Sequence, residues 1–350
     1  MLVIFSGLQQ QLGGDMEEEV HGIVIVGGGI CGLATALALH QKGIPSLVLE
    51  KSETLRADGG SIGVHVNGWR VLEQLGIASD LRETAGVVTE FHDVWQQEQG
   101  NKSVVVPVRG ELRWLKRKDL IETMAKNIPS GSIRFSCHIA AIRPADPGNH
   151  GAVLTTLDGS IVRAKALIGC DAFWHPGGDA TKDAHAMKDF LLEKLQGQCS
   201  DEILEMVRDP EPDSLIILTK IWYRPPWQVM FSSFQRGTVT VAGDAMHVMG
   251  TYIGQGGSAG LEDALVLARS LSRATAGSDG SELCEKKIGT AIKEYVKERR
   301  LRVVRLSLES FAMGTLLATK SLLAKLASFA IVSLLGTGTL RHTNYDCGRL

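Results

Sequence analysis

The sequence predicts an α/β fold in which helices cover a parallel β-sheet. The first observation is residues 22–50, where an apolar run, a glycine turn, a small-residue helix and a second apolar run form one βαβ pattern. The second is residues 237–264, where another apolar run leads into a glycine-rich loop and a helix. Together they predict a Rossmann-like domain, and the rest of the chain is expected to add an α+β domain and a C-terminal helical region.

The turn of the first unit carries Gly27, Gly29 and Gly32 in G-x-G-x-x-G spacing. The first glycine permits a tight turn, the second lets a pyrophosphate approach the backbone, and the third lets the helix pack closely on the strand. Strands are expected at 23–26 and 47–49, and the unpaired N–H groups at the helix start favour an anion. The pattern indicates a dinucleotide site; the alternative is an ordinary glycine-rich turn.

Glu50 ends the second strand, 18 residues after Gly32. At this position a carboxylate can accept hydrogen bonds from the adenosine ribose hydroxyls. Because an acid repels a 2′-phosphate, the site favours FAD or NAD over NADP.

The composition excludes several classes of function. The 350 residues can bury a large core, and a net charge of −2 with 22% charged residues offers no basic surface for nucleic acid. Six cysteines lack paired spacing, and ten histidines show no metal-ligand pattern. We expect reduced thiols, no metal site and a reducing compartment, either the cytoplasm or an organelle stroma.

The first 21 residues combine a short apolar run with an acidic flank at 17–19. This pattern is not that of a clear signal or transit peptide. We expect residues 1–21 to be a disordered extension before the first strand.

After Glu50, the run KSETLRADGGSIGVHVNGWRVLEQLGI predicts a loop, a short strand and a helix at about 67–75. It resembles the flavoprotein monooxygenases of the aromatic-hydroxylase type, particularly the plant members related to zeaxanthin epoxidase. The resemblance implies FAD, and Lys51 joins Glu50 among the candidate cofactor-binding residues. Arg56 either approaches the dinucleotide or is solvated in its loop.

A helix beginning at Arg117 resembles a family helix that starts with an arginine before a leucine-rich face. By that resemblance Arg117 lies against the flavin nucleotide, where its guanidinium can hold a phosphate or ribose oxygen. Arg113 is the rival for this role. Strands are expected on either side, at 104–108 and 132–138.

A hairpin is expected from strands at 152–157 and 161–169. The second strand leads into Gly169–Asp171, which resembles a G-x-D-G motif that touches FAD and the pyridine nucleotide in the family. Ala172 stands in place of its second glycine, and the serine and arginine that follow in the family are missing.

The stretch after Ala172 departs from the family. Members usually carry there a strand-rich sheet that covers the flavin ring, whereas this chain predicts helices at about 187–195 and 203–207. Only SLIILTKIWY at 214–223 and WQVMF at 227–231 are strand candidates. The substrate domain is therefore expected to be shortened.

The second match to the family follows a buried strand at 239–242. The carboxylate of Asp244 in the family reaches the ribityl or pyrophosphate oxygens. The loop with Gly254, Gly256 and Gly257 opens a helix whose N–H groups would face the flavin pyrimidine edge, where reduced flavin becomes anionic. The alternative is a structural turn in which Asp244 caps a helix.

His247 is interpreted as a packing or hydrogen-bonding residue rather than a catalyst. The family has prolines after this histidine, where the chain has Val248 and Thr251 or Tyr252.

The chain from about 288 to 335 is predicted to be helical, with the charge run 293–306 on a solvated face. In the apolar part, 311–338, Lys320 and Lys325 leave no uninterrupted 18-residue apolar span. The preferred prediction is a helix packed on the core, followed by peripheral membrane contact and then a true span.

The expected FAD-binding domain comprises residues 22–85, 109–171 and 237–275. The expected reduced substrate domain comprises 86–108 and 172–236, and the C-terminal helices occupy 283–340.

The resemblance implies an oxidoreductase: an FAD-dependent monooxygenase that uses NAD(P)H and O₂ to hydroxylate or epoxidise a small apolar or aromatic substrate. No side chain needs to act as a nucleophile, so no catalytic residue is named. Two alternatives stay open, an uncoupled or inactive FAD protein and a non-enzymatic interaction protein.

Overall fold

The computed structural model describes residues 18–55, 60–97, 100–145, 151–171, 188–189, 192–194, 196–197, 201–208, 223–275, 285–336 and 341–350. The chain forms two compact units, one from Met1–Ala172 with Tyr223–Leu350 and the other from Phe173–Trp222. Residues 1–17, Arg56 and the strand candidate 214–222 lie outside the described residues.

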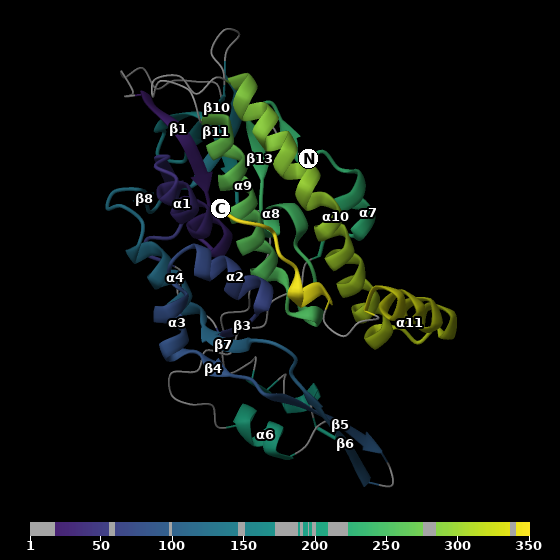
Figure 1. The fold of residues 1–350 in the computed structure, drawn as a ribbon. Coiled ribbons are helices and arrows are strands. Elements are labelled where there is room, and N and C mark those ends of the chain that lie inside the picture. Colours follow the sequence, from purple (N-terminus) through teal and green to yellow (C-terminus); the bar gives the residue numbers. More distant parts are fainter. Residues whose placement is uncertain are drawn as a thin grey trace. The chain divides into compact units, whose positions relative to one another are not determined.

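The larger unit is built on a mixed sheet with the strand order β12-β13-β11-β1-β2-β8 (Figure 1). Its parallel strands are β1 (Glu18–Val26), β2 (Ser46–Leu49), β8 (Ile133–Arg134), β11 (Ile161–Gly169) and β13 (Val239–Val241). Its antiparallel strands are β9 (Ile139–Pro144), β10 (Ala152–Thr156) and β12 (Gln235–Arg236). The carboxyl ends of β1, β2, β11 and β13 therefore meet at one edge, and the fold class is confirmed.

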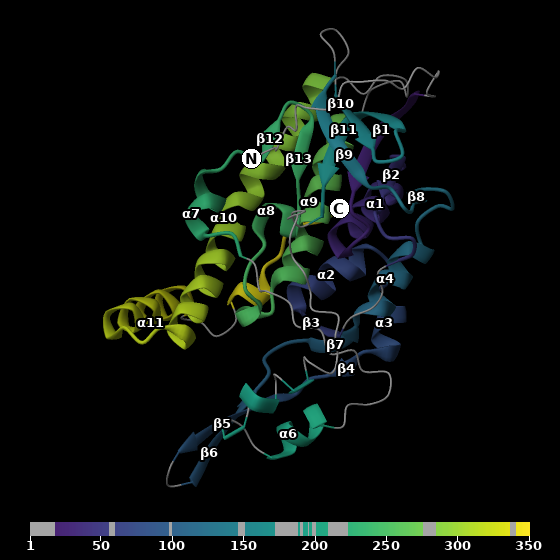
Figure 2. The ribbon, with the colours of Figure 1, turned by 180° about the vertical axis from the view of Figure 1, so that it is seen from behind.

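Alternate residues of β1 enter two apolar layers. Ile23 and Ile25 join the larger core, which also contains residues of α1 (Ile30–Gln41), α4 (Arg117–Lys126) and α9 (Gly256–Thr275), whereas Val24 joins the layer that includes β10. Figure 1 shows α1, α9 and α10 (Glu285–Ala318) on one face of the sheet, and Figure 2 shows β9 and β10 from behind. Since each fully buried Val or Ile contributes about 1.5–3 kcal/mol, β1 is fixed from both faces.

A smaller antiparallel sheet has the order β3-β7-β4, formed by β3 (Ser61–His65), β7 (Leu112–Lys116) and β4 (Gly86–Val87). Helices α2 (Val66–Gln74) and α3 (Ala78–Thr84) follow β3. Trp69 on α2 is buried, its indole N–H donates to the Val64 carbonyl, and the Arg82 guanidinium lies over its ring. These contacts fix the start of α2.

The remaining strands, β5 (Glu90–Gln97) and β6 (Gly100–Pro107), pair only with each other among the described strands. Phe91 and Val104–Val106 of this hairpin are 40% to 49% exposed. In the smaller unit, α6 (Asp201–Arg208) confirms the helix expected at 203–207.

Three expectations about elements are wrong. Residues 18–21 belong to β1 rather than to an extension, because they pair with 161–164 of β11. WQVMF is not a strand but part of helix α7 (Pro226–Phe231), because Pro226 sets the backbone for a helix start. The strand expected at 132–138 is reduced to β8, since the backbone turns at Ser136 with φ +58°.

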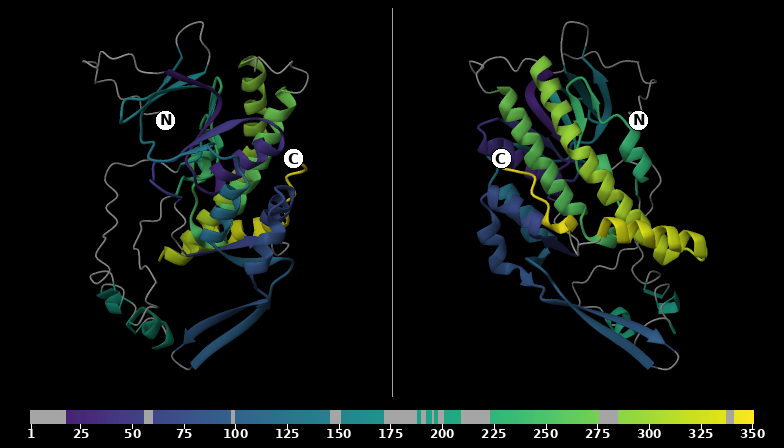
Figure 3. Two further views of the ribbon diagram at one scale, coloured as in Figure 1. Left: turned by 90° about the vertical axis from the view of Figure 1, so that its left-hand side faces the viewer. Right: turned by 45° about the vertical axis from the view of Figure 1, so that its right-hand side comes forward.

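The C-terminal helices behave differently from each other (Figure 3). Within the segment 311–338, the prediction of core packing agrees with the end of α10, where Ala312 is buried like Val303 and Leu306 before it. It is wrong for α11 (Leu322–Gly336), where Leu323 and Leu334 are 80% and 78% exposed, because the helix breaks at 319–321. Among the described helices, none has the length and apolarity needed to cross a membrane.

After α11, residues 341–350 return to the core, beginning with η2 (Arg341–Asn344). Arg70 of α2 donates to Asn344, and Arg269 of α9 donates to the Cys347 carbonyl at 2.6 Å. Cys347 is buried in the larger core. This terminal segment therefore ties α2 to α9.

Candidate functional site

The glycine turn after β1 has the packing that its spacing predicts. Gly27 has φ +108°, and a Cβ there would lie 2.9 Å from the backbone N of Asp171. A Cβ on Gly32 would lie 1.9 Å from the Gly27 carbonyl oxygen, whereas a Cβ on Gly29 would meet nothing within 4 Å. The fold itself requires the first and third glycines, while the second opens onto free space.

Helix α1 presents its N-terminus to that space. Gly29 is the N-cap, no side chain caps this end, and the first turn contains no acid. The helix dipole places about half a positive charge there. This arrangement is suited to binding a phosphate.

Glu50 lies beside the turn with 1% of its surface exposed. Its Oε2 accepts from the Gly28 backbone N–H at 2.6 Å, and its Oε1 accepts from the Ser52 N–H at 2.9 Å. A carboxylate has about four lone-pair sites, and these two backbone donors orient the carboxylate beside the glycine turn.

Lys51 and Asp171 meet across the end of β1. The Lys51 Nζ lies 2.8 Å from Asp171 Oδ2, and both side chains are about one-third exposed. The two residues follow β2 and β11, the strands on either side of β1. The structure thus brings two residues that the resemblance linked to the cofactor to the same sheet edge.

Strand β13 delivers the second motif to this edge. Gly243 has φ +60°, and a Cβ there would lie 2.7 Å from the Cβ of Cys31 in the first turn of α1. Helix α8 (Asp244–His247) therefore starts against α1. Asp244 is exposed at its first position.

The glycine loop before α9 joins the same group. Gly254 has φ +61° and ends the short helix η1 (Thr251–Ile253). A Cβ on Gly257 would lie 2.4 Å from Ile62 Cδ1 and 3.9 Å from Ile30 Cδ1 of α1, whereas a Cβ on Gly256 would meet nothing within 4 Å. The N-termini of α1 and α9 are therefore neighbours, each with one glycine open to a ligand.

A buried charge network holds this edge together. Asp263 accepts from the Gly243 N–H at 2.8 Å and Arg299 Nε at 2.6 Å, and its Oδ2 lies 2.7 Å from His247 Nε2. Burial raises the pKa of Asp263, but the charges and hydrogen bonds of His247 and Arg299 outweigh it and lower the pKa to about 2. His247 has no exposed surface, which agrees with a hydrogen-bonding role.

Arg117 and its rival Arg113 have different environments. The Nε of Arg117 is buried and has no hydrogen-bond partner among the described residues. Arg113 donates from Nε to Glu111 at 2.8 Å and lies over the Trp69 ring. A buried N–H without a partner costs stability, so a nucleotide oxygen at Arg117 would supply what the protein leaves open.

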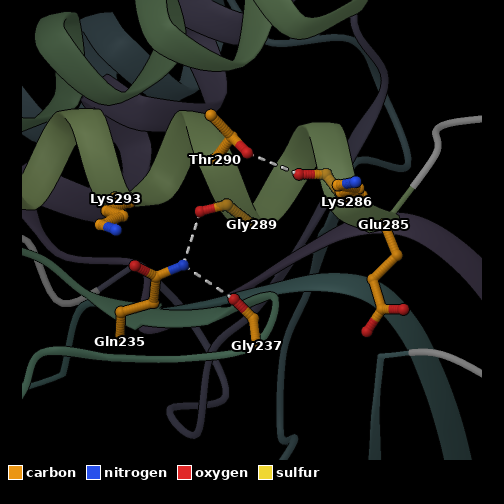
Figure 4. Close-up of a pocket in the computed structure, with 7 residues that line it drawn as sticks. All are labelled: Gln235, Gly237, Glu285, Lys286, Gly289, Thr290 and Lys293. Carbon is orange, nitrogen blue, oxygen red and sulfur yellow. Dashed lines mark hydrogen bonds between the residues drawn. The ribbon is translucent and has the colours of Figure 1, made fainter.

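A pocket of about 320 Å³ lies elsewhere, between β12 and the start of α10 (Figure 4). Its Gln235 amide already donates to the carbonyls of Gly237 and Gly289. No predicted cofactor residue lines it. The part of the chain that the structure describes also contains no cluster of residues suited to a metal ion.

The sequence patterns missed Gly28, Asp263 and Arg299. The run of three consecutive glycines, of which Gly28 is the middle one, was the available signal for Gly28. An acidic pair inside an apolar helix was the signal for Asp263. The expectation of a solvated charge run is wrong for Arg299 and Arg302, which are buried against Glu262 at 2.7 and 2.9 Å.

The chain is similar to known proteins in both sequence and structure. A family model described as FAD binding domain matches residues 20–182 and 193–307. Monooxygenase 1 of Arabidopsis thaliana is 37% identical over 404 residues, which cover 95% of this chain and 100% of that protein. Chloroplastic zeaxanthin epoxidase of an Oncidium hybrid cultivar is 25% identical over 375 residues, covering 83% and 54%.

Among solved structures, Klebsiella pneumoniae HpxO complexed with FAD and uric acid aligns with a TM-score of 0.68 at 21% identity, covering 93% of this chain and 96% of that one. This likeness supports the fold. The open glycines, the uncapped α1 and the unpaired Arg117 Nε fit FAD. The chain therefore belongs to the FAD-dependent monooxygenases of the aromatic-hydroxylase type, oxidoreductases whose cofactor is FAD.

Proposed function

We propose that the chain uses NAD(P)H and O₂ to hydroxylate or epoxidise a small apolar or aromatic substrate. The observation that carries this proposal is the meeting of α1, α8 and α9 at one sheet edge, with Gly29 and Gly256 open to a ligand. Family membership supports the reaction class.

Bound FAD would take a hydride from NAD(P)H and activate O₂. The chain binds and orients it: the N–H groups of α1 would face the pyrophosphate, and Glu50 would accept from the ribose. Asp244 would accept hydrogen bonds from ribityl hydroxyls or reach the pyrophosphate oxygens through a bridging water. Arg117 would hold a nucleotide oxygen. The N-terminus of α9 would stabilise negative charge on the pyrimidine edge.

The second candidate function is uncoupled oxidation of NAD(P)H, with hydrogen peroxide as the main product. Oxygen transfer requires water to be excluded, and the hairpin β5–β6 exposes apolar residues of the expected substrate domain. The alignment with Monooxygenase 1 spans 404 positions but uses only 95% of a 350-residue chain, so that relative has segments which this chain lacks. Under this second candidate, NAD(P)H oxidation by this chain is slow and largely uncoupled.

The discriminating experiment measures NAD(P)H loss, peroxide and oxygenated product together, across a panel of aromatic and isoprenoid compounds. Peroxide close to stoichiometric with NAD(P)H supports the uncoupled form. Tight coupling to any one compound shows that the cavity closes and contradicts the proposed impairment.

Asp244→Asn tests the cofactor position directly. Because Asp244 is exposed, we expect unchanged thermal stability and roughly tenfold weaker FAD binding, equal to about 1.4 kcal/mol. The matched control is Asp80→Asn, an exposed acid in the first turn of α3. Equal FAD affinity in the two variants would remove the role given to Asp244.

We also propose peripheral membrane contact through residues 311–338. Helix α11 exposes Leu322, Leu323, Leu326, Phe329 and Leu334. Residues 310–345 contain no acid, while Lys320 and Lys325 add positive charge. An apolar helix with basic residues suits an anionic lipid surface.

Sedimentation with phosphatidylcholine vesicles, with and without phosphatidylserine, tests this contact. Binding that requires phosphatidylserine and is lost in Leu323→Gln/Phe329→Gln supports it. Absence of binding, or self-association of the free protein that the same substitutions abolish, overturns it.

A further inference from the structure

Two buried amides connect the start of α2 to the glycine loop before α9. The Nδ2 of Asn67 donates to Gln255 Oε1 at 2.9 Å and to Glu262 Oε1 at 2.7 Å. Asn67 and Gln255 are each 1% exposed, and Glu262 is fully buried. Gln255 lies between Gly254 and the first residue of α9, so its side chain fixes the loop from inside.

The far end of this chain of contacts is rigid. Glu262 lies 2.7 Å from Arg299 Nη1 and 2.9 Å from Arg302 Nη2, both on α10. All three side chains are buried, and a carboxylate held by two guanidinium groups has little freedom to move. Asn67 is therefore held against a fixed acceptor, and it in turn holds Gln255.

The two helices also approach each other closely where these amides meet. A Cβ on Gly68 of α2 would lie 2.8 Å from the Oγ of Ser258 in α9. Neither helix has an acid in its first turn. The positive end of each helix dipole is therefore not neutralised by a carboxylate in its own first turn.

Each amide keeps one unused atom. Asn67 Oδ1 and Gln255 Nε2 are buried and have no hydrogen-bond partner among the described residues. Buried polar atoms without partners cost stability, and apolar residues of the same size would fill this space without that cost. Filling this space does not require amides. The hydrogen bond between the two amides therefore indicates a role other than packing.

We propose that Asn67 and Gln255 are positioning residues that hold the α9 N-terminus toward the flavin and thereby raise its reduction potential. This inference rests on the proposed position of the pyrimidine edge at α9. Loss of the contact would let the loop 254–257 move, so the N–H groups of α9 would stabilise anionic reduced flavin less.

The test measures the flavin midpoint potential and the affinity of the bound flavin for sulfite, whose adduct is also anionic. Asn67→Leu and Gln255→Met keep side-chain size and remove the amide. In each variant we expect about tenfold weaker sulfite binding and a potential lower by about 30 mV, the value of a tenfold change for a two-electron couple. Asn127→Leu, which removes an exposed amide at the C-cap of α4, should change neither quantity.

The double variant separates this coupling from general damage. If the two amides act through their mutual hydrogen bond, Asn67→Leu/Gln255→Met shifts the potential no further than either single variant. Additive shifts, or no shift in variants that still bind FAD, overturn the proposal. If one single variant fails to fold, the midpoint potential of the other single variant is compared with that of the Asn127→Leu control. Equal potentials in these two proteins overturn the proposal.

Gly256→Asp separates this inference from the proposed flavin position. The Cβ space at Gly256 is open, and an acid in the first turn offsets the positive potential of the helix N-terminus. Because a side chain at this position is expected to weaken FAD binding, the variant is measured at an FAD concentration that saturates it. An unchanged sulfite affinity in this variant shows that the flavin edge lies elsewhere. A shift in Gly256→Asp without one in Asn67→Leu refutes the positioning role alone.

Discussion

Two regions of the molecule differ in how far their side chains are buried and paired. One is the edge of the main sheet that holds the cofactor motifs, and the other comprises β5–β6 and α11. At the sheet edge, Asp263 has three partners and the helices meet at glycines. In β5–β6 and α11, side chains such as Val105 and Leu323 are 49% and 80% exposed. The difference teaches that buried contacts fix the sheet edge but not β5–β6 or α11. Under the proposed function, cofactor binding is therefore retained even where substrate enclosure is reduced.

The largest expected effect tests whether the sheet edge is as tightly built as its contacts indicate. Arg299→Met leaves Asp263 and Glu262 buried without a shared partner, and should lower the free energy of unfolding by about 3–5 kcal/mol. Urea denaturation measures it. The control Arg273→Met removes an exposed arginine of α9 and should change stability by less than about 0.5 kcal/mol. Equal losses would contradict the contrast.

The next prediction tests whether the open space at Gly29 and Gly256 is occupied by the cofactor rather than by protein atoms. Gly29→Ala and Gly256→Ala place a methyl group where no protein atom lies within 4 Å, so thermal stability should be retained. FAD affinity should fall roughly a hundredfold, or about 2.8 kcal/mol. Gly86→Ala, at an open position on β4, is the control. Full FAD affinity in both variants would show that neither glycine faces the cofactor.

A smaller effect concerns His65, the N-cap of α2. Burial, assisted by the charge of His342, lowers the pKa of His65 to about 4. The unfolded chain binds this proton near pH 6.5, so stability should fall as pH drops from 6.5 to 4, by on the order of 1–2 kcal/mol after partial solvation. Urea unfolding of His65→Gln at pH 7, 5.5 and 4.5 should lack this part of the slope. Parallel curves would refute the assignment.

The smallest expected effect concerns the exposed apolar residues of α11. Leu323→Gln and Leu334→Gln on α11 should each change the free energy of unfolding by less than about 0.5 kcal/mol and raise solubility. Leu306→Ala on α10, which is fully buried, should cost about 2–5 kcal/mol. Solubility assays and urea denaturation check both. A loss at Leu323 as large as that at Leu306 would mean that α11 is part of the core.

Local spacing suffices to predict the glycine turn, because Gly27, Gly29 and Gly32 stand within one turn. It also places Asp244 shortly after the end of β13. The roles of these residues toward the cofactor stay predictions. The burial of Arg299 and the exposure of α11 depend on partners distant in sequence, which periodicity does not identify. WQVMF has strand-forming residues, but the local effect of Pro226 prevailed.

The meeting of Gly243 with Cys31 has a consequence for biosynthesis. Strand β1 and its glycine turn leave the ribosome early, whereas β13 and α9 follow after most of the chain has been made. At about 5–20 residues per second, the first motif waits roughly ten to forty seconds for the second. During that interval the apolar faces of β1 and β11 lack their final helix cover. Under the proposed cofactor position, FAD can therefore bind the completed edge only after α9 has emerged.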